Sequence, residues 1–296
     1  MALFTPAVRR KKNLRMALIG VSGGGKTLSA LYIAYGMTGD WSKIAVIDSE
    51  HGGAELYSQR GDLNVGQFLH MNACPPFSPQ AYIEYIAEGA KIVGPDGVLI
   101  IDSMSHLWKG EGGVLDIKER IVATTKKNEF TAWNDAGKEQ DSLIGAILAA
   151  NCHVIATIRV KQDYAMIENE RGKTEPRKVG LAPVQRDDVE YEFDTVINIA
   201  RNHVATVSKD RTYLDSFAGI ITPEIGEGLR AWLNEGIEPK KCSVCGKVIF
   251  PTKNKSADDI AEGTAKHMGK PACVNCFKEW QKENEAAEAV SEQIAQ

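Results

Sequence analysis

Residues 20–27, which read Gly-Val-Ser-Gly-Gly-Gly-Lys-Thr, restrict the fold of this chain more than any other segment. They follow an apolar run at residues 16–19 and precede a stretch with the apolar spacing of an amphipathic helix. Glycines let a backbone wrap closely around phosphate groups and turn its N–H groups inward, and a helix N-terminus adds a favourable dipole. In this setting of strand, loop and helix, the pattern predicts a phosphate-binding loop of the Walker A type.

The loop and one later carboxylate predict a site for ATP and Mg²⁺. Lys26 is expected to contact the β- and γ-phosphates, and Thr27 to bind Mg²⁺. Asp102 ends a second apolar run, residues 98–101, and is the expected Walker B residue, which holds Mg²⁺ through a water. The other nucleotide-binding residues expected in the loop are Gly20, Ser22, Gly23, Gly24 and Gly25.

Short apolar runs alternate with segments of helical length between about residues 15 and 198. The runs lie at residues 16–19, 44–47, 98–101 and 154–158. Such continuous runs are typical of strands that are buried on both faces of a mostly parallel sheet. Two further runs, at residues 193–199 and 204–207, predict a hairpin at the sheet edge. The sequence therefore predicts an α/β fold, in which the polar segment 161–188 is a long loop.

Residues 46–51, Val-Ile-Asp-Ser-Glu-His, resemble the segment of RecA-type recombinases whose glutamate activates the attacking water. This resemblance implies that Glu50 is the catalytic base, the alternative being an exposed Glu at a helix start. The end of the next expected strand also resembles RecA, but Thr157 stands where RecA has Gln. Coupling between nucleotide and DNA is therefore expected to run through Arg159, which is also a candidate nucleotide contact.

Residues 208–211, Ser-Lys-Asp-Arg, resemble the Lys-x-Arg element of RecA-superfamily ATPases such as the DnaB and KaiC groups. In those groups both cations reach the ATP of a neighbouring subunit. The resemblance implies that Lys209 and Arg211 act in catalysis within a homo-oligomer, a ring or a filament. A short basic turn after a strand is the alternative.

Residues 13–236 as a whole resemble phage-encoded RecA-like nucleotide-binding proteins, including the single-strand annealing ATPases of the Sak group. The segments that carry this resemblance, besides the motifs above, are residues 101–108, 132–133, 153–159 and 209–211. The resemblance implies a RecA-like core and a Mg²⁺-dependent ATPase that binds single-stranded DNA and promotes annealing or strand exchange in phage recombination. A single-strand binding protein is a possible partner. A kinase of a small acceptor and a nucleotide-switched adaptor are the competing functions.

The segment 161–188 occupies the place of the RecA DNA-binding loop. Its four candidate DNA contacts are Arg171, Lys173, Arg177 and Lys178. Position, more than charge, makes this segment the first candidate for the DNA site.

Four cysteines form two pairs, Cys242-x-x-Cys245 and Cys273-x-x-Cys276. Two such pairs can close a tetrahedral Zn²⁺ site, since each tight turn presents two sulfurs to one ion. The long spacing between the pairs favours an extended knuckle or a treble-clef variant. His267 in place of one cysteine, or a redox role for a pair, is the alternative.

The cysteine segment is basic. Residues 240–282 contain nine lysines and four acids, with Phe250, Phe277 and Trp280 interleaved. Lysines with aromatic faces suit a single-stranded nucleic acid. Equally, the aromatics can form the small core of the module while the lysines are merely solvated.

The net charge of −4 argues against a uniformly basic nucleic-acid coat protein but hides local segments of opposite sign. The expected organisation is a basic arm at residues 1–12, the RecA-like core at 13–236, a zinc-finger module at 237–282 and an acidic tail at 283–296. The longest uncharged stretch, residues 142–158, is shorter than a membrane span of about 20 residues. The charged residues 9–12 follow an apolar start, whereas a signal peptide has its charges before its apolar core. We therefore expect a cytoplasmic protein without membrane contact.

Overall fold

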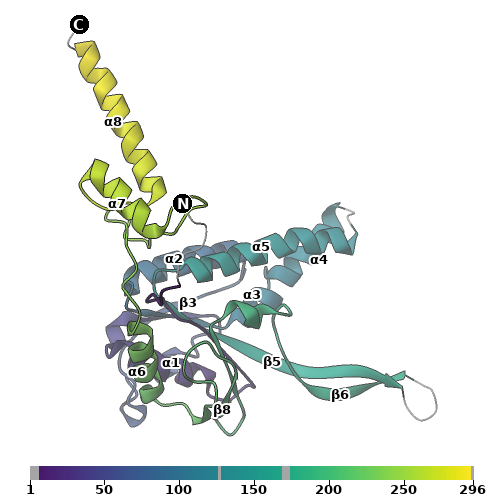
Figure 1. Cartoon of the computed structure of the whole chain (residues 1–296). Coiled ribbons are helices and arrows are strands. Elements are labelled where there is room, and N and C mark those ends of the chain that lie inside the picture. The colour runs from purple at the N-terminus through teal and green to yellow at the C-terminus, as the bar shows by residue number, and fades with distance from the viewer. Residues whose placement is uncertain (1–6, 126–127, 169–173, 295–296) are drawn as a thin grey trace. The chain divides into compact units, whose positions relative to one another are not determined.

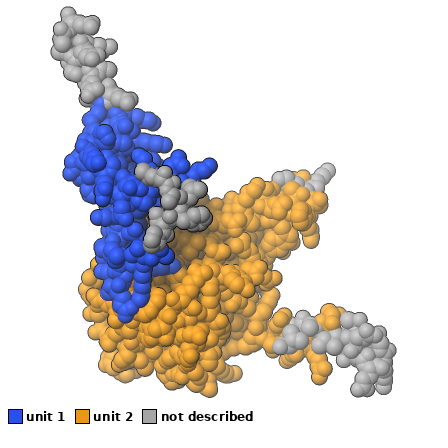
Figure 2. Space-filling view, in the orientation of Figure 1, with its two compact units in different colours: residues 1–12, 234–296 blue, residues 13–233 orange. Residues whose placement is uncertain are grey.

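The computed structural model describes residues 7–125, 128–168 and 174–294 and divides into two compact units. The core unit is Asn13–Leu233, and the terminal unit combines Met1–Lys12 with Asn234–Gln296 (Figure 2). In the core unit, nine strands form a mixed sheet with the order β3-β2-β4-β5-β1-β7-β8-β9, and β6 pairs with β5. The strands are β1 (Arg15–Gly20), β2 (Ile44–Asp48), β3 (Leu69–Asn72), β4 (Val98–Asp102), β5 (His153–Glu168), β6 (Thr174–Pro183), β7 (Thr195–Ile199), β8 (Val204–Lys209) and β9 (Ala218–Ile220).

The predicted α/β class and mostly parallel sheet are confirmed. Strands β3, β2, β4, β5, β1 and β7 pair in parallel, whereas β8 and β9 add to the edge in antiparallel pairing. The expected edge hairpin is β7 with β8, in which Ile199 pairs with Ala205. Each buried strand therefore contributes side chains to both faces of the sheet.

Helices cover both faces of the sheet (Figure 1). The α-helices are α1 (Lys26–Thr38), α2 (Pro79–Val93), α3 (Met104–Lys109), α4 (Val114–Thr125), α5 (Glu129–Ala149), α6 (Pro223–Asn234), α7 (Ala257–Met268) and α8 (Val274–Ile294). Short 3₁₀ turns occur at Trp41–Lys43, Glu55–Tyr57, Gly61–Leu63 and Val189–Glu192. Alternate β1 residues enter different cores: Leu18 packs with residues of α1 and α6, and Ile19 packs with residues of α2 and α5.

The segment 161–188 is mostly a two-stranded ribbon, so the prediction of a long loop is wrong. Strand β5 pairs with β1 as far as Arg159 and then continues into antiparallel pairing with β6, from Val160 with Pro183 to Glu168 with Thr174. Figure 1 shows this ribbon extending away from the sheet. Both strands carry exposed side chains, including Lys161, Gln162 and Leu181. Because the ribbon side chains whose burial is described are mostly exposed, among them residues 161–163, 177, 178 and 181, their sequence lacks the period-two apolar pattern by which half-buried strands are recognised.

The terminal unit joins the N-terminal segment to the chain that follows α6. The backbone N–H of Lys11 donates to the carbonyl of Ile237 at 3.0 Å, and the N–H of Ile237 donates to the carbonyl of Arg9 at 2.9 Å. Three cations of the predicted basic arm form ion pairs with acids of the same unit: Arg9 with Glu235, Arg10 with Asp258 and Lys11 with Glu238. The arm is thus neutralised in part by its own unit. Among the helices of the described ranges, none combines the length and the apolar character needed to cross a membrane.

Candidate functional site

The carboxyl ends of β1, β2, β4 and β5 lie at one edge of the sheet, because these strands are parallel. At this edge a cavity of about 450 Å³ brings together many of the residues predicted from sequence. Its lining includes Ser22, Gly23, Gly25, Lys26, Thr27, Glu50, Asp102 and Arg159. The volume lies within the usual range of small-molecule sites.

The glycine loop has the backbone that a phosphate cradle requires. Gly23 and Gly25 have φ angles of 74° and 90°, in the left-handed region that favours glycine. At Gly20 a Cβ atom would lie 2.5 Å from the carbonyl oxygen of Ile199, so a side chain does not fit there. Gly25 is also the N-cap of α1 and supplies no capping side chain. The first N–H groups of α1 are therefore available to an anion at the loop.

Two contacts hold the loop in place. The ammonium of Lys26 donates to the carbonyl oxygen of Val21 at 3.0 Å, and burial lowers the pKa of Lys26 while nearby Asp102 opposes this shift. The Nδ1 atom of His203 lies 3.0 Å from the carbonyl oxygen of Gly24. Sequence reasoning missed His203, which stands in the turn between β7 and β8, far from the loop in sequence.

The hydroxyl and carboxylate groups expected to hold Mg²⁺ are adjacent. Thr27 Oγ1 donates to Asp102 Oδ2 at 2.6 Å, and Thr157 Oγ1 donates to Asp102 Oδ1 at 2.5 Å. Burial raises the pKa of Asp102, and the hydrogen bonds from Thr157 and Thr27 oppose that shift by favouring the carboxylate. Hydroxyl and carboxylate oxygens are hard ligands, so this donor set fits Mg²⁺. Thr157, which stands where RecA has Gln, orients Asp102 through this hydrogen bond.

Glu50 is fixed at its backbone and at its carboxylate. Buried Asp48 accepts from the backbone N–H of Glu50 at 2.5 Å and from that of Ala54 at 2.8 Å, which shapes the turn after β2. Glu50 Oε1 accepts from Ser103 Oγ at 2.9 Å and from Arg159 Nε at 2.6 Å. Glu50 Oε2 forms an ion pair with the same Arg159 guanidinium. Both oxygens of the predicted base are thus engaged by one cation.

The remaining predicted site residues lie apart from the cavity lining. The Lys209 ammonium donates to the carbonyl oxygens of Glu190 at 3.0 Å and Tyr191 at 2.7 Å, and burial lowers its pKa. Arg211 is largely exposed and lies 3.5 Å from Asp194. The action of both cations on a neighbouring subunit's nucleotide stays a prediction.

Two of the four predicted DNA contacts lie on the ribbon. The side chains of Arg177 and Lys178 are exposed on β6. Arg171 and Lys173 lie outside the described residues.

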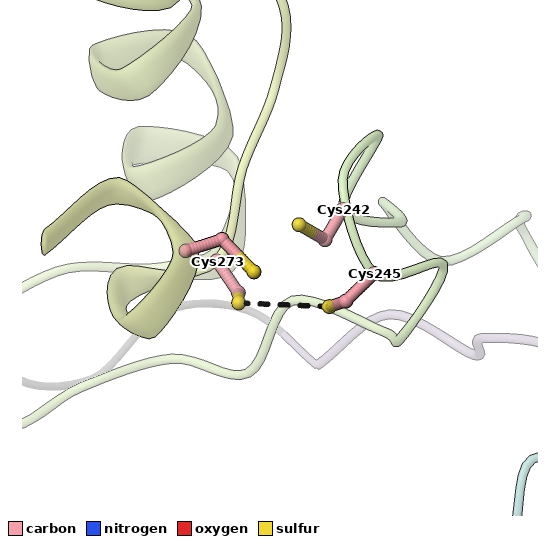
Figure 3. Close-up of side chains that lie close together, drawn as sticks. Cys242, Cys245 and Cys273 are labelled. Carbon is pink, nitrogen blue, oxygen red and sulfur yellow. Dashed lines mark hydrogen bonds between the residues drawn. The ribbon is translucent and has the colours of Figure 1, made fainter. Parts of the chain in front are cut away.

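The four cysteine sulfurs of the terminal unit lie within 4.8 Å of one another and could hold a metal ion. Cys242 and Cys245 come from a tight turn, in which the N–H of Gly246 donates to the carbonyl of Cys242, whereas Cys276 lies in the first turn of α8. Figure 3 shows Cys245 and Cys273 facing each other, with their sulfurs 3.9 Å apart.

Three thiols of the cluster have pKa values shifted in different directions. Burial opposes the shift at Cys242, yet backbone N–H groups lower its pKa to about 6, toward the thiolate that binds metals. Burial and the neighbouring sulfurs raise the pKa of Cys276, and at Cys245 the backbone N–H of Lys247 opposes a rise in pKa that burial and the neighbouring sulfurs cause. His267, the alternative ligand, is not part of the cluster and packs against the ring of Phe277 at 5.7 Å.

Comparisons with known proteins give two results. The family model described as "AAA domain" matches residues 12–218, which is most of the chain. No curated protein matches the sequence. The match includes every cavity residue named above and ends before the cysteine cluster.

Proposed function

The chain belongs to the AAA domain family, and from that premise we propose that it is a Mg²⁺-dependent ATPase of the RecA type. The observation that carries the proposal is the cavity in which Lys26, Thr27, Asp102 and Glu50 meet. A phosphate cradle, a magnesium-binding pair and a carboxylate base are the parts that hydrolysis of a phosphoanhydride requires.

Each residue has a role in the proposed reaction. The N–H groups of the loop and Lys26 bind the β- and γ-phosphates, while Thr27 and Asp102 hold Mg²⁺, which neutralises charge on the phosphate oxygens. Glu50 orients a water for in-line attack and accepts its proton. Glu50 can do so only when Arg159 releases it, since a carboxylate bound by a guanidinium is a weaker base. The γ-phosphate, an anion in the same cavity, competes with Glu50 for Arg159.

We further propose that the ribbon of β5 and β6 binds single-stranded DNA through Arg177 and Lys178. Arg159 is the last β5 residue paired with the core sheet, and Val160 is the first paired with β6. A ligand that bends or orders the ribbon therefore acts directly on the residue that holds Glu50. Annealing or strand exchange in phage recombination, within a ring or filament, is the process that the RecA-like segments favour.

For the cysteine cluster we propose a structural Zn²⁺ site with Cys242, Cys245, Cys273 and Cys276 as ligands. Two sulfurs from a turn and two from a helix start match a treble-clef arrangement. Four thiolates around one divalent ion leave no position for a reactant, as in structural zinc sites.

The Lys26→Ala substitution tests the ATPase directly. The variant is expected to lose at least about 99% of ATP turnover, because the phosphates lose their principal side-chain cation. Phosphate release is the measurement, and Lys43→Ala, which changes an exposed lysine away from the cavity, is the control. Turnover by Lys26→Ala at the wild-type rate would contradict the ATPase assignment.

The Arg177→Glu and Lys178→Glu double variant tests the ribbon. Single-strand affinity is expected to fall about tenfold or more and to depend less on salt, because fewer counterions are released on binding. Binding of a labelled oligonucleotide at several salt concentrations measures both effects. A Lys43→Glu and Lys91→Glu double variant carries the same charge change elsewhere on the core unit. Equal affinity of the two double variants would argue against the ribbon and for an adaptor or kinase that acts without DNA.

Metal analysis tests the cysteine site. The purified chain is expected to contain about one zinc per molecule, and Cys276→Ser is expected to lose it and to unfold the terminal unit at a lower temperature. Cys74→Ser is the matched control, since Cys74 is an exposed thiol outside the cluster. A zinc content of zero in the wild type, or full retention in Cys276→Ser, would rule out the proposed ligand set.

A further inference from the structure

Phe250 of the terminal unit lies outside the core of that unit and is exposed. That core consists of Cys242, Ile249, Ile260, Ala261 and Ala272. Phe250 directly follows buried Ile249, yet 74% of its surface is exposed. Phe277 and Trp280, by contrast, stack on each other at 5.8 Å and are half-buried. Of the two interpretations left open by the sequence, a core role is therefore excluded for Phe250.

Exposed lysines flank Phe250 on both sides. The N–H of Ile249 donates to the carbonyl of Lys240, and the N–H of Thr252 donates to that of Lys255. These bonds place the backbone of Lys240 beside Ile249, the residue before Phe250, and the backbone of Lys255 beside Thr252, two residues after Phe250. Together with two further exposed lysines they form what we call the Phe250 surface: Lys240, Lys247, Phe250, Lys253 and Lys255.

Three acids of the unit have partners outside this surface, although Lys255 also helps to lower the pKa of one of them, Asp259, whose hydrogen bonds to Ser256 lower it most. Asp258 pairs with Arg10, and Glu238 pairs with Lys11 and Lys241. Asp259 accepts from the backbone N–H and the hydroxyl of Ser256 in the capping box of α7. No ion pair found among the described residues involves a lysine of the Phe250 surface. The N-terminal arm thus pairs with Asp258 and Glu238, and the four lysines of the Phe250 surface outnumber the one carboxylate, Asp259, that is shown to act on them.

We propose that the Phe250 surface binds single-stranded nucleic acid without sequence preference. One base stacks on the exposed ring, and the lysines contact the phosphates before and after it. A duplex offers phosphates to the lysines, but its bases stay stacked on one another and do not stack on the ring. An acidic peptide offers carboxylates to the lysines but no base to stack on the ring. The site lies outside the family match and is a second nucleic-acid site besides the ribbon. The expectation that this nucleic acid is DNA rests on the proposed function.

Binding of a fluorescein-labelled oligo-dT strand to the full zinc-loaded chain, measured by anisotropy, tests the proposal. Phe250→Ala is expected to weaken binding about 5- to 150-fold, the range for loss of one stacked base, and Phe250→Trp to restore it. Phe130→Ala is the matched control, because Phe130 is 76% exposed on the core unit. Unchanged zinc content shows that the variants are folded.

Two further readouts separate this site from the ribbon and from the ATPase. The Lys247→Ala and Lys253→Ala double variant is expected to reduce the slope of log affinity against log salt by about 0.7 for each phosphate that the protein no longer neutralises. Phe250→Ala in the ribbon double-variant background is expected to cause the same fold loss as in wild type, and basal ATP turnover is expected to stay unchanged. If the wild type lacks turnover yet Phe250→Ala weakens binding, the ATPase fails and this site stands.

Three outcomes would overturn the site. Wild-type affinity of Phe250→Ala in both backgrounds would exclude stacking. An equal loss of affinity for a labelled duplex in Phe250→Ala would show that the ring does not stack on unpaired bases. Displacement of the oligonucleotide by polyglutamate, with no effect of Phe250→Ala, would assign the surface to an acidic protein partner.

Discussion

Parallel pairing of β1, β2, β4 and β5 is the constraint on which the nucleotide cavity depends. It places Gly20, Asp48, Asp102 and Arg159 at one sheet edge although these residues are far apart in sequence. Buried apolar side chains on both faces stabilise this pairing at about 25 cal/mol per Å² of apolar surface removed from water. The polar ends of the strands are thereby presented together, and the glycine loop, the Thr27 and Asp102 pair and Glu50 all lie at that edge.

Arg159 gives this arrangement its link to the rest of the molecule. Its guanidinium holds Glu50, and its backbone is the last point at which β5 belongs to the core sheet. The pair is half-buried, with side-chain exposures of 41% for Arg159 and 24% for Glu50, so an anion that enters the cavity can reach the guanidinium. Strand β5 thus carries Thr157, which donates to Asp102, and Arg159, which binds Glu50, and then continues into the ribbon.

The parts of this protein that depend on neighbouring residues could be predicted from the sequence, and the parts that depend on distant contacts could not. The glycine loop, the buried strands and the cysteine pairs are local patterns, and the structure contains all three. The ribbon was not predicted because its described side chains, such as those of Lys161 and Gln162, are mostly exposed, and exposed strands show no apolar period. The ion pair of Glu50 with Arg159 joins residues that are 109 positions apart, so no local sequence pattern predicts it. Likewise the pairing of Arg10 with Asp258, and the exposure of Phe250 next to buried Ile249, follow from tertiary packing.

We propose that Arg159 couples the binding of single-stranded DNA on the ribbon to ATP hydrolysis, in which Glu50 activates the attacking water. The most direct measurement is the ratio of ATP turnover with and without oligo-dT, compared between the wild type and Arg159→Ala. The account predicts a ratio well above one for the wild type and close to one for Arg159→Ala, because the variant has no cation to withdraw from Glu50. Equal stimulation of both proteins, or none in the wild type, would contradict it.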